Sequence, residues 1–462
     1  MTDFASFLAP DRGQPARLLH VVHPDAWAAW LAGQPPRIRT AVAAHGLTGK
    51  PGNAAILPGD GAEDWAALLV CDEAQDSPWR IASRATALPE GTYRLATGEP
   101  GAGMLGWCLA QHRFDRYRKG DASGARILLT GEPNRIEPTI RMAQAIARVR
   151  DLVNLGASDL GPAEIENEVA RLGEAHGATL TVTRGRDLET GYPMIHAVGQ
   201  AAAKGREPRL IELEWGNPAH PRVAIVGKGV AFDSGGLDIK PSSGMRLMKK
   251  DMGGAAHAIA LAGLVMAERL PVRLHLLVPA VENAIAGNAF RPGDVLNTRK
   301  RLTVENTNTD AEGRLILGDA LTRAGEDAPE LILDFATLTG AARVALGPDL
   351  PPLFTDDEAL AADLIAAGVA EQDPMWRMPL WDGYDDMLKS DIADLVNAPD
   401  GGFAGAITAA LFLRRFVPKA TVWAHLDVFA WRPVAKPGRP KGGEAYALRA
   451  TWRMLQGRYP GP

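Results

Sequence analysis

The spacing of apolar residues along the chain predicts strands and helices in alternation. Apolar, β-prone segments predict strands at 126–130, 179–183, 210–215, 223–230, 272–278, 331–335 and 421–428. Apolar residues at helical spacing predict helices at 136–155, 162–176, 254–269 and 313–324. Apolar strands separated by helices are typical of a mostly parallel sheet that is buried on both faces. The pattern therefore predicts an α/β protein, in which ligands bind beyond the carboxyl ends of the strands.

Glycine- and proline-containing breaks suggest where the chain divides. The segment up to residue 130 mixes short apolar stretches with such breaks, and the strand at 126–130 is followed by the turn-like sequence GEPN. The helix predicted at about 136–155 then connects this part to the rest. We expect a small N-terminal α/β domain over 1–133, and a larger domain over 134–462 whose mostly parallel sheet is flanked by helices.

Composition and charge exclude several classes of partner. Among 462 residues, Lys and Arg total 50 and Asp and Glu total 55, which gives a net charge of −5. Up to residue 130 the chain has 13 basic and 13 acidic residues, so it lacks the basic stripe that binds nucleic acid. The chain has two cysteines, and its N-terminus does not resemble a secretory signal. No apolar run is long enough to span a bilayer. We expect a soluble, cytoplasmic protein with no membrane partner.

Charged residues lie at and just beyond the end of the predicted strand at 223–230, where a buried sheet does not normally tolerate them. Lys228 and Asp233 lie at the end of this strand, glycines lie beside them, and Lys240 follows. Asp251 comes directly before the apolar helix at 254–269. These side chains are therefore candidates for a charged site at the carboxyl edge of the sheet.

A second charged segment precedes the helix at 313–324. Asp310 and Glu312 are two residues apart, so an extended backbone would direct both carboxylates to the same side. Arg314 lies in the first turn of the helix, where free backbone N–H groups favour an anion.

Four carboxylates in one place would repel one another, and two divalent cations would neutralise them. Oxygen ligands suit Zn²⁺, Mn²⁺ or Mg²⁺. Lys228 could add a nitrogen ligand if its amine lost a proton, and Lys240 could stabilise an oxyanion. The alternative is that Asp251 and Asp310 cap the helices that follow them and that the lysines form ordinary surface ion pairs.

Several segments resemble one known family. The segment 308–315 (NTDAEGRL) matches the signature of the leucyl aminopeptidase (cytosolic aminopeptidase) family without a mismatch. The segment 226–236 (VGKGVAFDSGG) resembles the other metal-binding segment of that family. Further resemblances lie at 337–340, 405–413 and 423–427, and the sequence FAWRP at 429–433 is most similar to a peptidase B-like bacterial branch.

The resemblance implies a metal-dependent aminopeptidase, which removes the N-terminal residue of peptides by means of a metal-bound hydroxide at a two-metal site. It implies five metal ligands: Lys228, Asp233, Asp251, Asp310 and Glu312. Lys240 would stabilise the oxyanion, and Arg314 would hold a bicarbonate ion as general base. The resemblance also implies four substrate-binding residues, Met248, Asn308, Thr337 and Gly340. The resemblance further implies that the protein acts on peptides with a free N-terminus and that it assembles into a homohexamer.

The chain departs from the family pattern at two charged positions near the site. Lys250 stands where an aromatic or small residue is usual, and Asp238 where an apolar or small polar residue is usual. We expect these charges to alter the preference for the substrate side chain. Two other functions remain alternatives: a DNA-binding accessory protein of the same fold, and a two-metal hydrolase of phosphoesters.

Overall fold

The computed structural model describes residues 2–61, 63–120 and 124–461. The chain forms two compact units, one comprising the residues up to Ala147 together with Val434–Lys441, the other Arg148–Pro433 and the residues from Gly442 onward. Helix α5 (Ile136–Asn154) runs from the first unit into the second, at the position predicted for the connecting helix. The domain boundary predicted between residues 133 and 134 falls just before this helix.

In the described part of the first unit, six strands form one sheet in the order β1-β6-β5-β2-β4-β3. The pairs are parallel except for that of β3 with β4. The strands are β1 (Leu8–Pro10), β2 (Arg17–Val22), β3 (Ala54–Pro58), β4 (Trp65–Val70), β5 (Gly91–Leu95) and β6 (Arg126–Thr130). The helices are α1 (Trp27–Ala32), α2 (Pro36–Ala44), α3 (Ala82–Ala87) and α4 (Gly103–Gln111). The expected small α/β domain is confirmed, and β6 is the strand predicted at 126–130.

The second unit contains a mixed, mostly parallel sheet in the order β16-β15-β18-β14-β9-β11-β8-β7, with β10 also paired to β11. The central strands β18, β14, β9 and β11 are parallel to one another, and β8 and β7 continue the sheet antiparallel. The strands are β7 (Thr179–Arg184), β8 (Arg209–Trp215), β9 (Arg222–Gly227), β10 (Gly229–Asp233), β11 (Arg273–Asn283), β14 (Leu331–Ala336), β15 (Pro352–Phe354), β16 (Trp376–Arg377) and β18 (Val422–Asp427).

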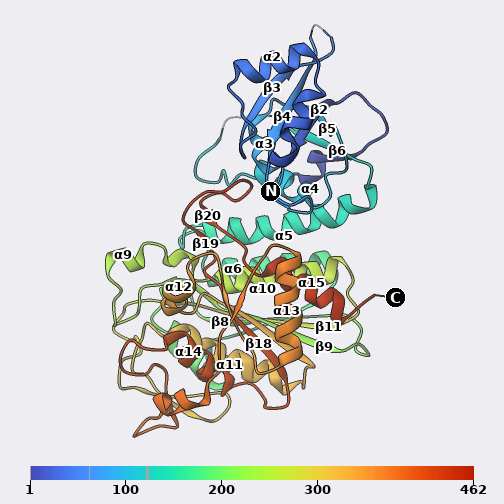
Figure 1. Cartoon of the computed structure of the whole chain (residues 1–462). Coiled ribbons are helices and arrows are strands. Elements are labelled where there is room, and N and C mark those ends of the chain that lie inside the picture. The colour runs from blue at the N-terminus through green and yellow to red at the C-terminus, as the bar shows by residue number, and fades with distance from the viewer. Residues whose placement is uncertain (1, 62, 121–123, 462) are drawn as a thin grey trace. The chain divides into compact units, whose positions relative to one another are not determined.

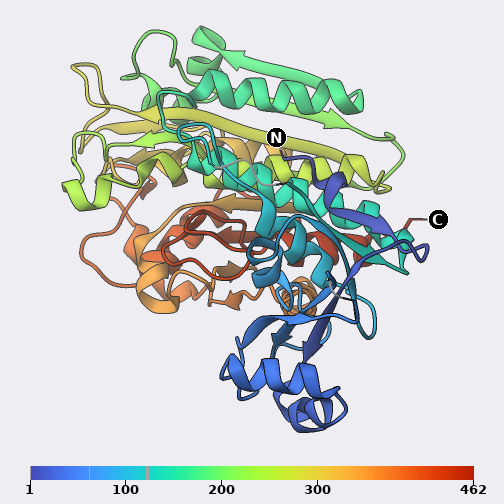
Figure 2. The same ribbon diagram turned by 90° about the horizontal axis from the view of Figure 1, so that it is seen from above.

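Helices cover both faces of this sheet (Figures 1 and 2). Helix α10 (Gly253–Ala267) packs on one face, and helices α8 (Pro193–Gly199) and α11 (Glu312–Glu326) pack on the other. The remaining helices are α6 (Pro162–His176), α7 (Gly185–Gly191), α9 (Ser242–Met245), α12 (Gly340–Leu346), α13 (Glu358–Ala370), α14 (Gly405–Arg414) and α15 (Leu448–Arg458). Smaller elements are β12 (Val295–Asn297), β13 (Thr303–Glu305), β17 (Leu395–Val396), β19 (Trp431–Arg432), β20 (Gly442–Gly443) and the 3₁₀ helix η4 (Met248–Lys250). No helix among the described residues is long and apolar enough to cross a membrane.

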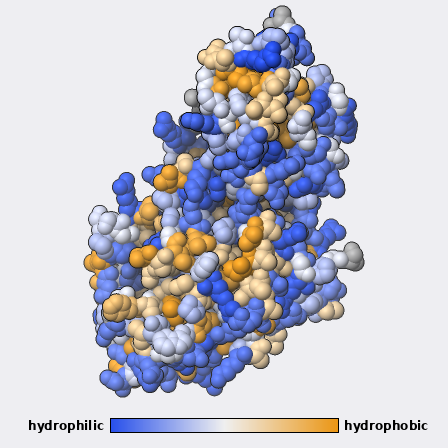
Figure 3. All heavy atoms as spheres, in the orientation of Figure 1, coloured by the Kyte–Doolittle hydropathy of each residue, from blue (hydrophilic) through white to orange (hydrophobic). Residues whose placement is uncertain are grey.

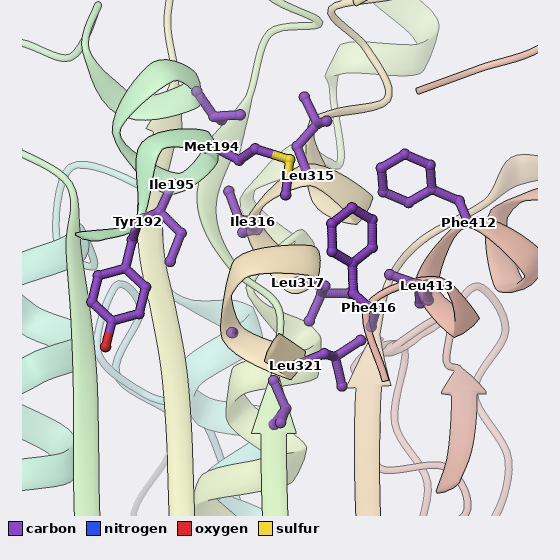
Figure 4. Close-up of a cluster of buried hydrophobic side chains, with 14 of the residues drawn as sticks. Tyr192, Met194, Ile195, Leu315, Ile316, Leu317, Leu321, Phe412, Leu413 and Phe416 are labelled. Carbon is purple, nitrogen blue, oxygen red and sulfur yellow. The ribbon is translucent and has the colours of Figure 1, made fainter. Parts of the chain in front are cut away.

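An apolar core fixes α11 against the sheet. Figure 4 shows side chains of α8, α11 and the segment around α14 that point toward one another. Met194, Leu317 and Phe412 in this cluster are fully buried, and the rings of Phe412 and Phe416 lie 5.1 Å apart. Because a close-packed interior resists displacement, the first turn of α11 is held in a fixed place.

The prediction of one continuous strand at 223–230 is wrong. Strand β9 ends at Gly227 and pairs with both β14 and β11, whereas β10 begins at Gly229 and pairs with β11 alone. Between them, the amide of Lys228 donates to the carbonyl of Phe335, and the carbonyl of Lys228 accepts from the amide of Ala255. Both strands run parallel to β11 in the same register, so the break interrupts the pairing at Lys228 without turning the chain. The side chain of Lys228 lies in the charged cluster described below.

The N-terminus of α10 approaches the sheet so closely that only glycine fits. A Cβ atom on Gly254 would lie 2.1 Å from the carbonyl oxygen of Phe335, and one on Gly227 would lie 2.6 Å from the Cα of Ala255. Both obstacles are backbone atoms, which cannot rotate away as a side chain can. The two glycines therefore determine how closely Asp251, just before α10, approaches the strand ends.

We predict that Gly254→Ala lowers the free energy of unfolding by about 1–3 kcal/mol, because the added methyl group forces α10 away from the sheet. The shift of the thermal or urea midpoint measures this change. Gly457→Ala is the matched control, since Gly457 lies in α15 and a Cβ there meets nothing within 4 Å. The control should be neutral or stabilising by up to about 1 kcal/mol. Equal midpoints for the two variants would contradict the close approach of α10.

Candidate metal centre

Charged side chains converge at the carboxyl ends of the central strands. Asp233 is the last residue of β10, and Glu312 is the first residue of α11. Carboxylate oxygens of Asp233, Asp310 and Glu312 all lie within 4.8 Å of one another. Asp251 is linked to Glu312 by Lys228, whose Nζ contacts both carboxylates. The five residues predicted as metal ligands are therefore brought together by the fold.

Lys228 lies between two of the buried carboxylates. Its Nζ is 2.7 Å from Oδ2 of Asp251 and 2.9 Å from Oε1 of Glu312, and it donates to the carbonyl of Thr337 at 3.0 Å. Burial alone would lower the pKa of Lys228, but the attraction of Asp251, Glu312 and Asp233 outweighs burial and raises the pKa above its ordinary value. The amine is a cation in this arrangement.

Lys240 compensates the opposite side of the cluster. Its Nζ lies 2.8 Å from Oδ2 of Asp233 and forms a second ion pair with Asp310. Burial opposes the charge of Lys240, but attraction to Asp233 and the hydrogen bonds to both carboxylates raise its pKa. Two lysines thus stand against four carboxylates, so the cluster keeps an excess of negative charge.

The pKa values of two of these acids are raised above their ordinary values. Burial, followed by repulsion from Asp233, raises the pKa of Glu312 to about 8 and that of Asp310 to about 6. Oε2 of Glu312 is buried and has no hydrogen-bond partner among the described residues. Buried carboxylate oxygens without donors fit divalent cations, which would supply the missing positive charge. The residues present therefore suit a metal centre made mostly of oxygen ligands.

The alternative that Asp251 and Asp310 cap helices is wrong. Met252 is the N-cap residue of α10 and Ala311 that of α11, and neither cap has a side-chain hydrogen bond. The expectation of extended backbone between Asp310 and Glu312 is also wrong, because Ala311 has φ −110° and ψ 39°. The turn nevertheless brings both carboxylates to one side, and neither is used for capping.

Two asparagines that the sequence did not single out order the cluster. Asn283, the last residue of β11, donates from Nδ2 to Oδ1 of Asp233 at 2.8 Å and to the carbonyl of Thr309 at 3.1 Å. Oδ1 of Asn397 accepts from the amides of Thr307 and Asn308. A polar residue that ends an apolar strand is a signal that could have identified Asn283. Asn397 lies far along the chain from the loop it holds, so the sequence offers no such signal.

Arg314 is buried in the first turn of α11, as predicted. Its Nη1 donates to the carbonyl of Asn397 at 2.6 Å, while its Nε is buried without a hydrogen-bond partner among the described residues. Burial lowers the pKa of Arg314 to about 10, so the guanidinium remains a cation at neutral pH. An unused donor on a cation at a helix N-terminus fits a small anion.

The four residues predicted to bind substrate lie around this cluster. Oγ1 of Thr337 donates to Oδ1 of Asp251 at 2.7 Å, and Oδ1 of Asn308 accepts from the amide of Asp310 at 2.8 Å. Met248 is buried in η4, and Gly340 is the first residue of α12. Thr337 and Asn308 are therefore committed to orienting acidic residues of the site, and their roles in binding substrate stay predictions.

We predict that Asn283→Ala weakens Mn²⁺ binding by about 10–100-fold, because Asp233 loses a side-chain donor that orients its carboxylate. Isothermal titration of the metal-free protein with Mn²⁺ measures the dissociation constant. Asn288→Ala is the matched control, since Asn288 is exposed and its Nδ2 donates to the carbonyl of Gln200, away from the carboxylate cluster. Unchanged affinity in Asn283→Ala would show that Asn283 does not order a metal ligand.

The fold and the site together define an α/β metalloenzyme with a separate N-terminal domain. Residues 147–451 match the model of the cytosol aminopeptidase family, catalytic domain, and residues 18–130 match that of the M17 aminopeptidase N-terminal domain. The chain belongs to the cytosol aminopeptidase family, and its activity is that of a metal-dependent aminopeptidase, a metalloexopeptidase.

Relatives support this assignment over most of the chain. A probable cytosol aminopeptidase of Syntrophotalea carbinolica is 40% identical over 369 residues, which are 76% of this chain and 73% of the relative. The crystal structure of a cytosol aminopeptidase from Coxiella burnetii is 43% identical, with a TM-score of 0.93, and the match covers 98% of this chain and 99% of that one. The bottromycin maturation enzyme BotP, in complex with Mn, is 32% identical with a TM-score of 0.85, and the match covers 96% and 100%.

Proposed function

We propose that this aminopeptidase holds two divalent metal ions in the carboxylate cluster and removes the N-terminal residue of peptides there. The observation that carries the proposal is the buried group Asp233, Asp310 and Glu312, whose oxygens lie within 4.8 Å of one another. Asp233 and Glu312 would contact both ions, Asp310 would complete one site, and Lys228 with Asp251 would complete the other. Lys228 would have to lose its proton to serve as a ligand, and neighbouring cations favour that loss.

The metals proposed are Zn²⁺ or Mn²⁺, with Mg²⁺ as a further candidate, because the site consists mostly of carboxylate oxygens. The structure of BotP in complex with Mn supports Mn²⁺ in particular. When bound, the ions polarise the scissile carbonyl and lower the pKa of an attacking water. The side chains of the cluster hold the ions in place and exclude bulk water, because Asp233, Asp251 and Glu312 are each at most 2% exposed.

Asp251 is proposed to bind the free α-amine of the substrate. Thr337 fixes its carboxylate through a hydrogen bond of 2.7 Å, and the carboxylate is fully buried. A buried carboxylate favours a charged amine over the neutral amide of an internal peptide, which brings no positive charge to it. This explains the removal of N-terminal residues rather than cleavage within the chain.

Lys240 is proposed to stabilise the oxyanion that forms when water attacks the peptide carbonyl. Its ammonium now pairs with Asp233 and Asp310. Once these carboxylates hold metal ions, they need Lys240 less, and its charge becomes available to the oxyanion. A cation held in place before the reaction stabilises such charge without reorganising.

Arg314 is proposed to bind a bicarbonate ion that accepts the proton of the attacking water. The support is its buried, unpartnered Nε and its place in the first turn of α11. The hydrogen bond from Nη1 to Asn397 fixes the guanidinium and leaves Nε for an anion.

The remaining proposals concern substrate and assembly. Met248, Asn308, Thr337 and Gly340 are proposed to line the place of the first substrate residue. A homohexamer is proposed, and large apolar side chains exposed in the second unit, such as Val344 and Phe403 at 90% and 85%, are consistent with covered surfaces. Figure 3 shows hydrophobic residues among the hydrophilic ones on one face.

We further propose a cytoplasmic location, membership of the peptidase B-like bacterial branch, and functional domains divided between residues 133 and 134.

We predict that Glu312→Gln reduces hydrolysis of leucine p-nitroanilide by about 10³-fold or more, because a neutral amide cannot hold the metal charge that lowers the barrier. Initial rates with Mn²⁺ or Zn²⁺ measure the loss, and circular dichroism checks the fold. Glu326→Gln is the matched control, since Glu326 is the last residue of the same helix and is partly exposed. Full activity in Glu312→Gln would refute the proposed metal ligands.

A further inference from the structure

Lys250 is a buried cation that lacks a hydrogen bond next to the carboxylate cluster. It is the last residue of η4 and only 2% exposed. Its nearest acid is Asp251, whose Oδ1 lies 3.8 Å from Nζ, beyond hydrogen-bond distance. No described residue accepts a hydrogen bond from Nζ. A buried ammonium is costly unless it is both paired and hydrogen-bonded, so one ion pair at this distance leaves the ammonium able to accept a further negative group.

The charges around Lys250 do not meet that need. Asp251 and Asp427 attract it, whereas Lys228 and Arg343 repel it. Asp251 is already bound by Lys228 at 2.7 Å and by the hydroxyl of Thr337. Asp427 accepts hydrogen bonds from the loop that follows β14. Lys250 therefore shares Asp251 with Lys228 and Thr337, and neither Lys250 nor Arg343 has a carboxylate among the described residues that it contacts alone.

Lys250 and Arg343 both lie against the aromatic ring of Phe429. Nζ of Lys250 lies 5.4 Å from the centroid of its ring, and Cζ of Arg343 lies 4.6 Å from it. The ring face attracts positive charge but does not neutralise it. Arg343 belongs to α12, the helix that begins at Gly340. Lys250 and Arg343 thus lie against the same ring, and Lys250 places its charge 3.8 Å from Asp251.

The location determines which part of a substrate would meet this charge. If Asp251 binds the α-amine, as the proposed function states, the first side chain branches from the adjacent carbon and must lie within a few bonds of Asp251. We propose that Lys250, with Arg343 as a second cation, selects substrates whose N-terminal residue carries a carboxylate, glutamate or aspartate. The same charge disfavours an N-terminal lysine or arginine. This inference rests on the proposed function and adds the class of substrate.

The wild-type enzyme tests the selection with substrates that differ only in charge. Glutamate and glutamine p-nitroanilides have nearly the same shape, so their ratio of kcat/KM isolates the carboxylate. We expect a ratio of about 10 or more in favour of glutamate, the value of one hydrogen bond to a charged group. Methionine should likewise be preferred over lysine, a residue of similar length. A glutamate-to-glutamine ratio near 1 would overturn the proposal, whatever any variant does.

Removing the cation assigns the effect to Lys250. Lys250→Met keeps the length of the buried side chain, and we expect the glutamate-to-glutamine ratio to fall toward 1. Lys249→Met is the matched control, because the Nζ of Lys249 donates to the carbonyl of Asn154. The control should keep the wild-type ratio. An unchanged ratio in Lys250→Met would overturn the role of Lys250. If the metal-loaded wild type hydrolysed none of these anilides or leucine p-nitroanilide, the proposed function itself would fail instead.

Discussion

Mutual repulsion among buried carboxylates is the constraint on which the site depends. Asp233, Asp310 and Glu312 converge within 4.8 Å, and Asp251 joins them through Lys228. Burial, together with repulsion that the two lysines reduce without cancelling, raises the pKa of Glu312 to about 8. A fold that collects acids in this way gains stability from added cations, so metal binding and the native arrangement support each other.

Close packing of glycines makes this convergence possible. Gly227 and Gly254 let α10 approach the ends of β9 and β14, and a Cβ on Gly313 would lie 2.5 Å from Cε of Lys228. On the other face of the sheet, the apolar cluster of α8, α11 and α14 holds Glu312 in position. The acids are thus forced together by backbone contacts and core packing, since their own interactions would drive them apart.

The sequence predicted most of the architecture because apolar periodicity is a local signal. The strand at 126–130, the helix at 162–176 and the mostly parallel sheet are confirmed. The strand at 223–230 was mispredicted because the break at Lys228 is imposed by contacts with Phe335 and Ala255, which are distant in sequence. Apolar character alone cannot reveal such a break.

For the site, residue type and position after strands identified the charged side chains, but not what orients them. The fold brings the five predicted ligands together, and their roles remain predictions. Asn283 and Asn397 act from β11 and from the loop after β17, so only the folded chain connects them to Asp233 and Asn308. The charge of Lys250 was visible in the sequence, whereas its lack of a hydrogen bond became apparent only in the structure.

The central claim is that this cluster holds two metal ions, and anomalous diffraction from crystals grown with Mn²⁺ tests it most directly. The account predicts two peaks among Lys228, Asp233, Asp251, Asp310 and Glu312. A second group, Glu214, His275 and Asp327, also has potential ligand atoms within 4.8 Å of one another, but arginines pair with both of its acids. Peaks at that group alone, or no peak at the carboxylate cluster, would contradict the account.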